Sequence, residues 1–234
     1  MAKYQRILLK LSGEVMAGRS AFGIDGERVA ALALEIAEVV RAGVQIGLVV
    51  GGGNFIRGVT ASRDLDRVTA DHMGMLATVM NALALQDRFE RMNVPARVMS
   101  AIHMSQVCEA YTVRRALRHL EKGRVVIFAG GTSNPFFSTD TGAALRALEM
   151  HAEVLAKATR VDGVFDKDPL THPDAVMFKQ VSPQEVLARG LQVMDATAVA
   201  MCRDHHLPVI VFNLNVPGNI MRMTMGESIG TLIC

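Results

Sequence analysis

Apolar runs of strand length alternate with stretches of helical periodicity along the whole chain. Parallel strands need long crossover connections, usually helices, so this alternation is typical of a parallel sheet covered by helices. We therefore predict an α/β fold, a three-layer αβα sandwich around a mostly parallel sheet. The predicted strands are 7–11, 44–50, 96–101, 124–129, 152–159 and 207–214, with 230–234 as an edge strand. The predicted helices are 25–43, 71–92, 112–121, 140–150, one that opens at 182, 195–205 and one after 217–218.

Several helix starts carry capping residues. Asp25, Asp140 and Asp195 precede helical stretches and are predicted N-caps. The run Ser182-Pro183-Gln184-Glu185 is a capping box with proline at the first helical position. The segment 161–174 has no such pattern, and a loop of that length in a compact domain is usually functional or mobile.

Composition narrows the functional classes. The chain has 234 residues, 50% hydrophobic and 21% charged, enough for one compact domain or two lobes sharing a sheet. Net charge is only +2, aromatic content is 5% and tryptophan is absent, which argues against nucleic-acid binding. Three separated cysteines indicate reduced thiols in a cytoplasmic protein. We expect neither a signal peptide nor a membrane span, because the apolar runs are short and broken by glycine.

Three loops at predicted strand ends combine glycine with cationic, hydroxyl or amide groups. They are Lys10-Leu11-Ser12-Gly13-Glu14, Gly51-Gly52-Gly53-Asn54 with Arg57 beyond it, and 130–140. Such groups form phosphate sites, and three of them on one sheet suggest two phosphorylated ligands. The chain has no G-x-x-x-x-G-K-[ST] loop, and Ile56 breaks the G-x-G-x-x-G pattern, so the phosphate cradle is of another kind.

Each loop also has a plainer interpretation. Lys10, taken alone, can be a strand-end lysine in solvent, and Asp140 can be only a helix cap. One glycine after a strand is ordinary, but three in a row favour close approach of a ligand to the backbone. Thr132 and Asn134 offer donors and acceptors for a base edge.

The predicted long helix carries apolar residues on more than one face between Met73 and Leu85. Its methionines are typical of core packing. A helix buried on two sides packs on its own sheet and on something else, so we predict a homo-oligomer interface there. Cys202, His205 and His206 share a helical face, but without a second cluster they do not form a metal site.

The motifs together resemble the amino-acid kinase superfamily, and within it the bacterial UMP kinase branch. The resemblance covers nearly the whole chain. The stretches that carry it are 10–14, 51–54 with Arg57-Gly58, Asp71-His72-Met73-Gly74-Met75-Leu76-Ala77-Thr78, 131–140, 158–165 with Asp168-Pro169, and Val193-Met194-Asp195. Asp71–Thr78 and Asn134-Pro135-Phe136-Phe137 point to the UMP kinase branch.

The resemblance implies an amino-acid kinase-like fold and phosphorylation of UMP to UDP by ATP, with Mg²⁺ held mainly by the ATP phosphates and no metal ligands of the protein's own. It implies an N-terminal UMP-binding and oligomerisation lobe, roughly 1–157, and a C-terminal ATP-binding lobe, roughly 158–234. The implied ATP contacts are Lys10, Leu11, Ser12, Gly13, Gly53, Arg57, Thr159, Phe165 and Asp168. The implied UMP contacts are Gly52, Asp71, Thr132, Ser133, Asn134, Pro135, Phe136, Phe137, Ser138 and Thr139. The implied catalytic residues are Lys10, Arg57, Asp140 and Asp195.

The resemblance also implies that the protein is a homohexamer and acts in pyrimidine-nucleotide synthesis.

The sequence departs from the family pattern at several positions. Many relatives have tyrosine at Phe165, so a hydroxyl contact is missing here. Gln86 and Glu90 replace groups that are basic in GTP-activated members, which argues against GTP as an effector and favours UTP feedback.

Two alternatives stay open. One is a superfamily member that phosphorylates an acid or carbamate, for which the neutral 132–139 loop is less suited than for a nucleobase. The other is a nucleotide-binding storage or regulatory protein that has lost the chemistry, against which Lys10, Arg57 and Asp140 argue.

Overall fold

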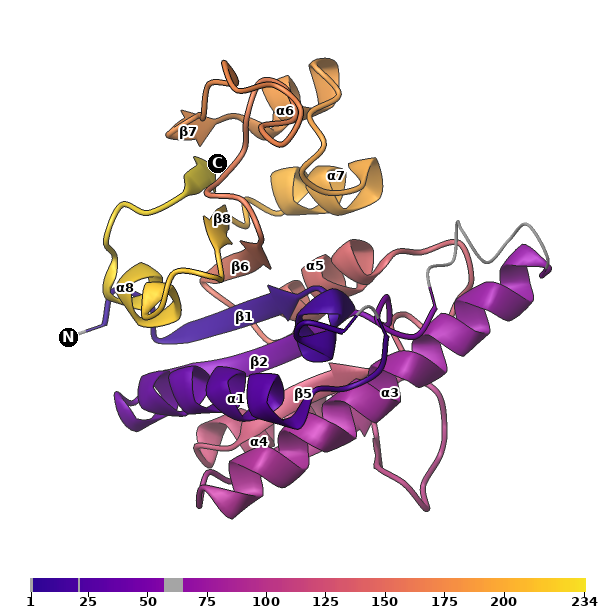
Figure 1. Ribbon diagram of the computed structural model, residues 1–234. Coiled ribbons are helices and arrows are strands. Elements are labelled where there is room, and N and C mark those ends of the chain that lie inside the picture. The colour runs from indigo at the N-terminus through magenta and orange to yellow at the C-terminus, as the bar shows by residue number, and fades with distance from the viewer. Residues whose placement is uncertain (1, 21, 57–64) are drawn as a thin grey trace.

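The computed structural model describes residues 2–20, 22–56 and 65–234, so Arg57 and Gly58 lie outside the described residues. Nine strands in the described part of the chain form one sheet, in the order β4-β3-β5-β2-β1-β6-β8-β9-β7 (Figure 1). Neighbouring strands pair in parallel except β8 and β9, which are antiparallel. The predicted mostly parallel sheet is confirmed. The strands are β1 Arg6–Leu11, β2 Gln45–Val50, β3 Ala96–Ser100, β4 Glu109–Ala110, β5 Val125–Ala129, β6 Val154–Thr159, β7 Gln180–Val181, β8 Val209–Asn213 and β9 Thr231–Ile233.

Helices cover both faces of the sheet, which confirms the three-layer αβα prediction (Figure 1). One face packs against α1 (Gly26–Arg41), α3 (Arg67–Arg91) and α8 (Asn219–Met225). The other packs against α4 (Val113–Glu121), α5 (Thr139–Glu149), α6 (Pro183–Ala188) and α7 (Ala196–Asp204). A short 3-10 helix, η1 (Gly13–Ala17), follows β1.

Strand alternation divides the apolar core into two clusters. On β1, Ile7, Leu9 and Leu11 face the α1/α3 layer and Leu8 faces the α5 layer. Because side chains alternate across a strand, Lys10 lies on the same face as Leu8, toward α5. The same alternation on β6 places Leu155 and Lys157 on that face. The sheet thus directs both lysines to one side.

Several elements differ from the sequence-based predictions. β9 is not an edge strand, because the two-residue β7 pairs with its outer side. The long helix begins at Arg67 rather than Asp71, because Asp66 caps it by accepting hydrogen bonds from Val68 N (2.9 Å) and Thr69 N (3.2 Å). The short elements β4, β7 and η1 were not predicted, since segments of two to five residues show no clear periodicity.

The capping predictions succeed except at one helix. Asp25, Ser182 and Asp195 cap α1, α6 and α7 as predicted. The prediction for Asp140 is wrong: Ser138 is the N-cap of α5, and its Oγ accepts hydrogen bonds from Asp140 N (3.0 Å) and Thr141 N (3.2 Å). A serine two residues earlier satisfies the first amides, which leaves the Asp140 carboxylate for other partners.

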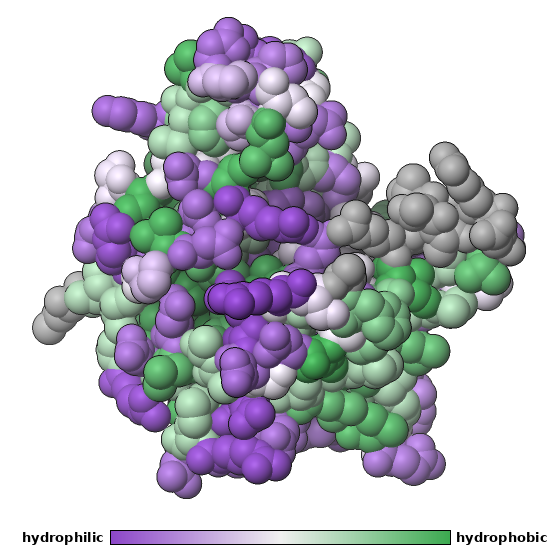
Figure 2. All heavy atoms as spheres, viewed as in Figure 1, coloured by the Kyte–Doolittle hydropathy of each residue, from purple (hydrophilic) through white to green (hydrophobic). Residues whose placement is uncertain are grey.

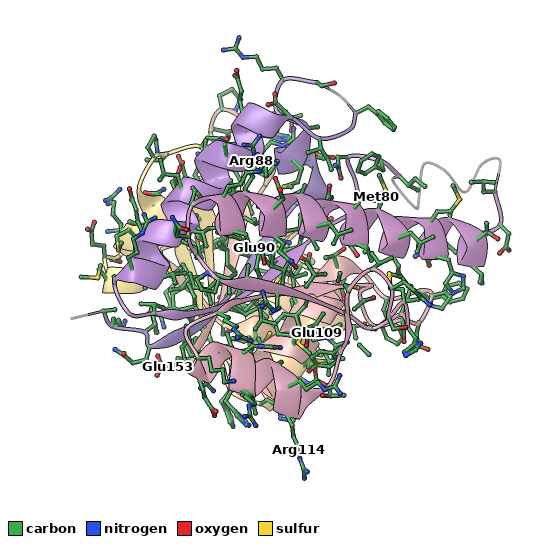
Figure 3. All side chains as sticks on the ribbon, turned by 90° about the horizontal axis from the view of Figure 1, so that it is seen from below. Met80, Arg88, Glu90, Glu109, Arg114 and Glu153 are labelled. Atoms are coloured by element: carbon green, nitrogen blue, oxygen red, sulfur yellow. The ribbon has the colours of Figure 1, made fainter. Side chains whose placement is uncertain are left out.

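Helix α3 buries one side and exposes apolar residues on another. Ala82, Leu85 and Phe89 pack in the core, whereas Leu76 and Met80 are each 49% exposed. Figure 2 shows apolar surface along this helix, and Figure 3 shows Met80 midway along it and Glu90 toward its end. Among the described residues, no helix is both long and apolar enough to span a membrane.

The parallel strands bring the candidate loops to one edge of the sheet. β1 and β2 end side by side, with Leu11 opposite Val50, so the segment after each strand leaves at the same place. The backbones after them touch: a Cβ on Gly13 would lie 2.4 Å from Gly51 O and 2.7 Å from Gly53 N. The first two candidate loops therefore form one compact unit.

Gly13→Ala should destabilise the protein by about 1–3 kcal/mol, because the clashing backbone atoms cannot rotate away. Gly74→Ala is the matched control: it adds the same methyl group within α3, where no atom lies within 4 Å of the new Cβ. We expect it to leave the free energy of unfolding unchanged or raise it by up to about 1 kcal/mol. Urea denaturation measures both, and wild-type stability of Gly13→Ala would contradict the packing argument.

Candidate active site

Lys10 and Lys157 lie opposite each other on neighbouring strands at the centre of the sheet. Their Cα atoms are register partners in the parallel β1–β6 pair. Their side chains are only 12% and 13% exposed. Two buried ammonium groups repel each other and lose hydration, so this arrangement needs a compensating negative charge.

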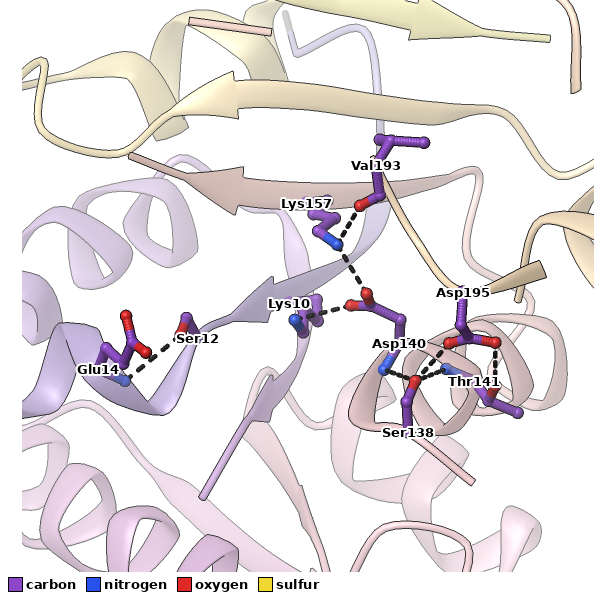
Figure 4. A network of polar contacts seen from close by, with 9 residues as sticks. All are labelled: Lys10, Ser12, Glu14, Ser138, Asp140, Thr141, Lys157, Val193 and Asp195. Atoms are coloured by element: carbon purple, nitrogen blue, oxygen red, sulfur yellow. Dashed lines mark hydrogen bonds and ion pairs between the residues drawn. The ribbon is translucent and has the colours of Figure 1, made fainter. Parts of the chain in front are cut away.

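Asp140 supplies that charge from the first turn of α5 (Figure 4). Its Oδ1 lies 2.7 Å from Lys10 Nζ and its Oδ2 lies 2.6 Å from Lys157 Nζ. Lys157 Nζ also donates a hydrogen bond to the carbonyl of Val193. One carboxylate, itself 14% exposed, thus holds two lysines in place.

Charge and burial act in opposite directions on these groups. Burial alone would raise the pKa of Asp140, but Lys10 and Lys157 outweigh it and hold that pKa below its ordinary value. Burial lowers the pKa of Lys157, and the neighbouring charge of Lys10 lowers it further, against the opposing effect of Asp140. When all three are ionised, the cluster carries a net charge of one positive unit, which suits an anionic ligand.

Asp195 lies beside this cluster and joins α7 to α5. Its Oδ2 accepts a hydrogen bond from Ser138 Oγ, and its Oδ1 accepts from Thr141 Oγ1 (2.8 Å) and Ala198 N (3.0 Å). Figure 4 shows its contacts with Ser138 and Thr141 next to the lysine pair. Because both oxygens are bound by the protein, Asp195 positions the start of α5 in this structure.

The loop between β5 and α5 contains the residues predicted to read a nucleobase. Within it, Thr132 Oγ1 accepts from Asn134 N (3.3 Å) and donates to Asn134 O (3.2 Å). Phe136 and Phe137 are 68% and 48% exposed. The loop runs from Gly130 through the predicted contacts Thr132, Ser133, Asn134, Pro135, Phe136, Phe137, Ser138 and Thr139.

Asp71, one of the predicted UMP contacts, reaches that same loop from α3. Its Oδ2 accepts hydrogen bonds from Phe136 N and from Arg67 Nε, both at 2.8 Å. A side chain 65 residues away in sequence is therefore brought to the loop by the tertiary fold.

A cavity of about 510 Å³ is lined mainly by residues from 159–169 and 189–193. Thr159, Phe165 and Asp168 all line it, so the structure brings together three of the predicted ATP contacts. Val193, whose carbonyl binds Lys157, lines it too. The hydroxyl of Thr159 is bound to the carbonyls of Val161 (2.7 Å) and Phe212 (3.2 Å).

The glycines at 51–53 serve packing against α3 and also leave space beside the backbone. A Cβ on Gly52 would lie 2.5 Å from Gly74 O, so Gly52 allows the turn to pack against α3. The nearest atom to a Cβ on Gly53 is 3.9 Å away, which leaves room beside its backbone. Leu11, another predicted ATP contact, is fully buried, and its carbonyl accepts a hydrogen bond from Gly51 N (3.0 Å).

Sequence reasoning missed Lys157. It stands inside the apolar run of β6, where a charge is costly unless it is paired. A lysine in the interior of a central strand was the available signal, but strand pairing was needed to show that it lies opposite Lys10.

The carboxylates in this region do not offer a metal cage of their own. Asp140 is bound by two lysines, and Asp195 by two hydroxyls and an amide. No group of three or more His, Cys, Asp or Glu side chains within 2–20, 22–56 and 65–234 is arranged to hold a metal ion.

Asp140→Asn should lower the free energy of unfolding by about 3 kcal/mol at neutral pH, because two buried lysines lose their counter-charge. The folded pKa of Asp140 lies below its ordinary value of 3.8, so the carboxylate's contribution is complete above that pH and is lost as pH falls through the folded pKa. Urea denaturation at several pH values should show the wild-type advantage shrinking at low pH. An advantage that stays constant into strong acid would contradict the ion-pair argument.

Comparison with known proteins agrees with this architecture. The amino acid kinase family model matches residues 5–213. Among solved structures, UMP kinase from Bacillus anthracis is 39% identical with a TM-score of 0.95, covering 98% of this chain and 96% of that one. UMP kinase from Ureaplasma parvum is 34% identical with a TM-score of 0.92, covering 99% of each chain. Uridylate kinase from Archaeoglobus fulgidus is 29% identical with a TM-score of 0.74, covering 97% of this chain and 99% of that one. With its family matched over most of its length and its αβα fold shared with these enzymes, the chain belongs to the amino acid kinase family.

Proposed function

We propose that this protein is a UMP kinase, which transfers the γ-phosphoryl group of ATP to UMP and releases ADP and UDP. The single observation that carries the proposal is the Lys10–Asp140–Lys157 cluster. Lys157 binds the carbonyl of Val193, which lines the 510 Å³ cavity, and Asp140 directly follows the neutral, amide-rich loop 132–139. The chain's similarity to UMP kinases over almost its whole length supports UMP as the substrate.

The chemistry requires charge neutralisation more than proton transfer. A phosphate monoester has a second pKa near ~6, so the acceptor oxygen of UMP is already mostly ionised at neutral pH. The obstacle is repulsion between two polyanions held in line. Lys10 and Lys157 offset that repulsion, and Asp140 orients them without removing a proton.

The donor nucleotide occupies the cavity side of the cluster in this proposal. Thr159, Phe165 and Asp168, which line the cavity, surround adenosine. The phosphates lie along Ser12 and the adjoining Gly13 and Gly53 toward Lys10. Arg57 is proposed as a further phosphate contact from outside the described residues. Mg²⁺ bound to the ATP oxygens would reduce their negative charge.

The acceptor occupies the loop side. The backbone and amide groups of 132–139 read uracil, with Gly52 and Asp71 beside the ribose and phosphate. An amino-acid or carbamate acceptor would need a cationic or carboxylate-binding site, and the side chains of 132–139 are uncharged. The proposal therefore divides the chain into an acceptor lobe, roughly 1–157, and a donor lobe, roughly 158–234.

Regulation and location follow from these substrates. The activity would supply UDP for UTP and CTP synthesis in the cytoplasm, and UTP could inhibit by occupying the acceptor site. GTP is not favoured as an effector: Gln86 accepts from Val98 N (3.0 Å) and donates to Glu90 (3.3 Å), and Glu90 pairs with Arg97 (3.2 Å). The positions where a basic group would meet a nucleotide are held by polar contacts within the subunit.

The exposed apolar face of α3 is the proposed contact between subunits. Val68, Met73, Leu76 and Met80 are 36–49% exposed on this one helix. Such a stripe can pair with its own copy across a two-fold axis, and the family resemblance points to a hexamer built from such pairs.

An ADP-release assay tests the proposed activity. We expect turnover with UMP and ATP, weak or no turnover with aspartate, glutamate or carbamate, and measured preferences among UMP, CMP and dUMP. Lys10→Ala should reduce kcat by at least ~10²-fold, because the removed charge acts on the transferring group, while UMP binding measured by calorimetry is retained. Turnover restricted to an acid acceptor, or an unchanged kcat for Lys10→Ala, would contradict the proposal.

Leu76→Glu should weaken the oligomer, since it places a charge on the proposed apolar contact. Leu34→Glu on α1 is the matched control, because Leu34 is also 49% exposed but lies on another helix. Sedimentation velocity should show smaller species for Leu76→Glu and the wild-type species for Leu34→Glu. Equal assembly of both variants would exclude this face.

A further inference from the structure

One part of the Asp71–Thr78 motif has no role in the chemistry described so far. Thr78 is 6% exposed on α3, and its Oγ1 accepts a hydrogen bond from Gly130 N (2.9 Å) while donating one to Met75 O (2.6 Å). Gly130 is the first residue after β5, where the 130–139 loop begins. The hydroxyl is therefore the partner of a buried backbone amide at the entrance of that loop.

The backbone at this entrance is tightly constrained. Gly130 and Gly131 both have left-handed φ angles, +73° and +55°. A Cβ on Gly130 would lie 2.9 Å from Ser100 Oγ and 3.0 Å from Ile102 N, so no other residue fits there without movement. Small changes at this turn would redirect every residue that follows in the loop.

Arg146 holds the next peptide from α5. Its Nη2 donates to Gly131 O (3.2 Å), and its guanidinium is fixed by Glu149 (2.5 Å) and by the Tyr111 ring, 3.9 Å from the ring centroid. Thr78 and Arg146 thus hydrogen-bond to the consecutive residues Gly130 and Gly131 from helices on opposite faces of the sheet.

Thr78 and Asp71 also share one face of α3, because residues seven apart are two helical turns apart. Asp71 binds Phe136 N in the middle of the loop and Thr78 binds Gly130 N at its start. One helix face therefore sets both the origin and the path of the loop.

We propose that Thr78 is a positioning residue for the acceptor nucleotide, which acts through Gly130 to hold the 130–139 loop in the geometry that reads the base. The inference rests on the proposed function, because it assumes that this loop binds UMP. The hydroxyl itself is buried beneath the loop and touches no substrate.

The test compares Thr78→Val with Thr78→Ser. Valine keeps the shape of threonine but removes the hydroxyl that accepts the hydrogen bond from Gly130 N. We therefore expect the KM for UMP, and the Kd for UMP measured by calorimetry without ATP, to rise roughly tenfold. The KM for ATP and kcat at saturating UMP should change by roughly twofold or less, because Asp195 holds the start of α5 independently. Serine keeps the acceptor and should restore wild-type UMP affinity.

Thr224→Val is the matched control. Thr224 is fully buried on α8, and its hydroxyl donates to Ile220 O (2.7 Å) within its own helix. It should lower the melting temperature without changing either KM. If Thr78→Val does not fold, Thr78→Ala removes the same acceptor without placing a methyl group against Gly130.

The outcomes separate the two proposals. If the wild-type protein does not bind UMP, the proposed function fails. If it binds UMP and Thr78→Val binds equally well, or if both KM values rise together, only the role of Thr78 fails. Failure of Thr78→Val and Thr78→Ala to fold, while Thr224→Val folds, would assign Thr78 to folding and overturn the proposal.

Discussion

A single carboxylate that neutralises two buried lysines is the interaction on which the candidate site depends. Without Asp140, Lys10 and Lys157 would face each other across neighbouring strands with little solvent to screen them. The cluster needs three independent features of the fold: the β1–β6 register, the side of the sheet to which both lysines point, and the start of α5. A one-residue slip of either strand would turn its lysine to the other face.

Helix α3 connects the other parts of the site. Its core side packs on the sheet, and the turn after β2 packs against it because a Cβ on Gly52 would meet Gly74 O. Asp71 and Thr78 hold the loop after β5 at two points. A further side exposes apolar residues where we propose that a second subunit binds. The same helix therefore borders both the 130–139 loop and the proposed subunit interface.

Much of this arrangement was predictable, because local patterns carry it. Strand-length apolar runs and helical periodicity identified the αβα fold, and Asp25, Ser182 and Asp195 cap the helices that they were predicted to cap. The Asp140 prediction failed for a physical reason: Ser138 and Asp140 are both good capping residues, and only the tertiary partners of Asp140 decide between them. The two-residue strands β4 and β7 are too short to leave a periodic signal, and they form because neighbouring strands offer free edges.

The sequence by itself determined the fold class, the edge of the sheet where the loops gather and the chemical types available there, because periodicity and strand direction are local properties of the chain. The tertiary structure decided which of those groups meet. Lys157 is an isolated lysine in a β-strand until register places it opposite Lys10, and Thr78 is one more helix residue until Gly130 folds against it. The Lys157–Asp140 contact joins residues 17 positions apart, and the Thr78–Gly130 contact joins residues 52 positions apart. Both depend on how strands and helices pack, and no local pattern encodes that packing.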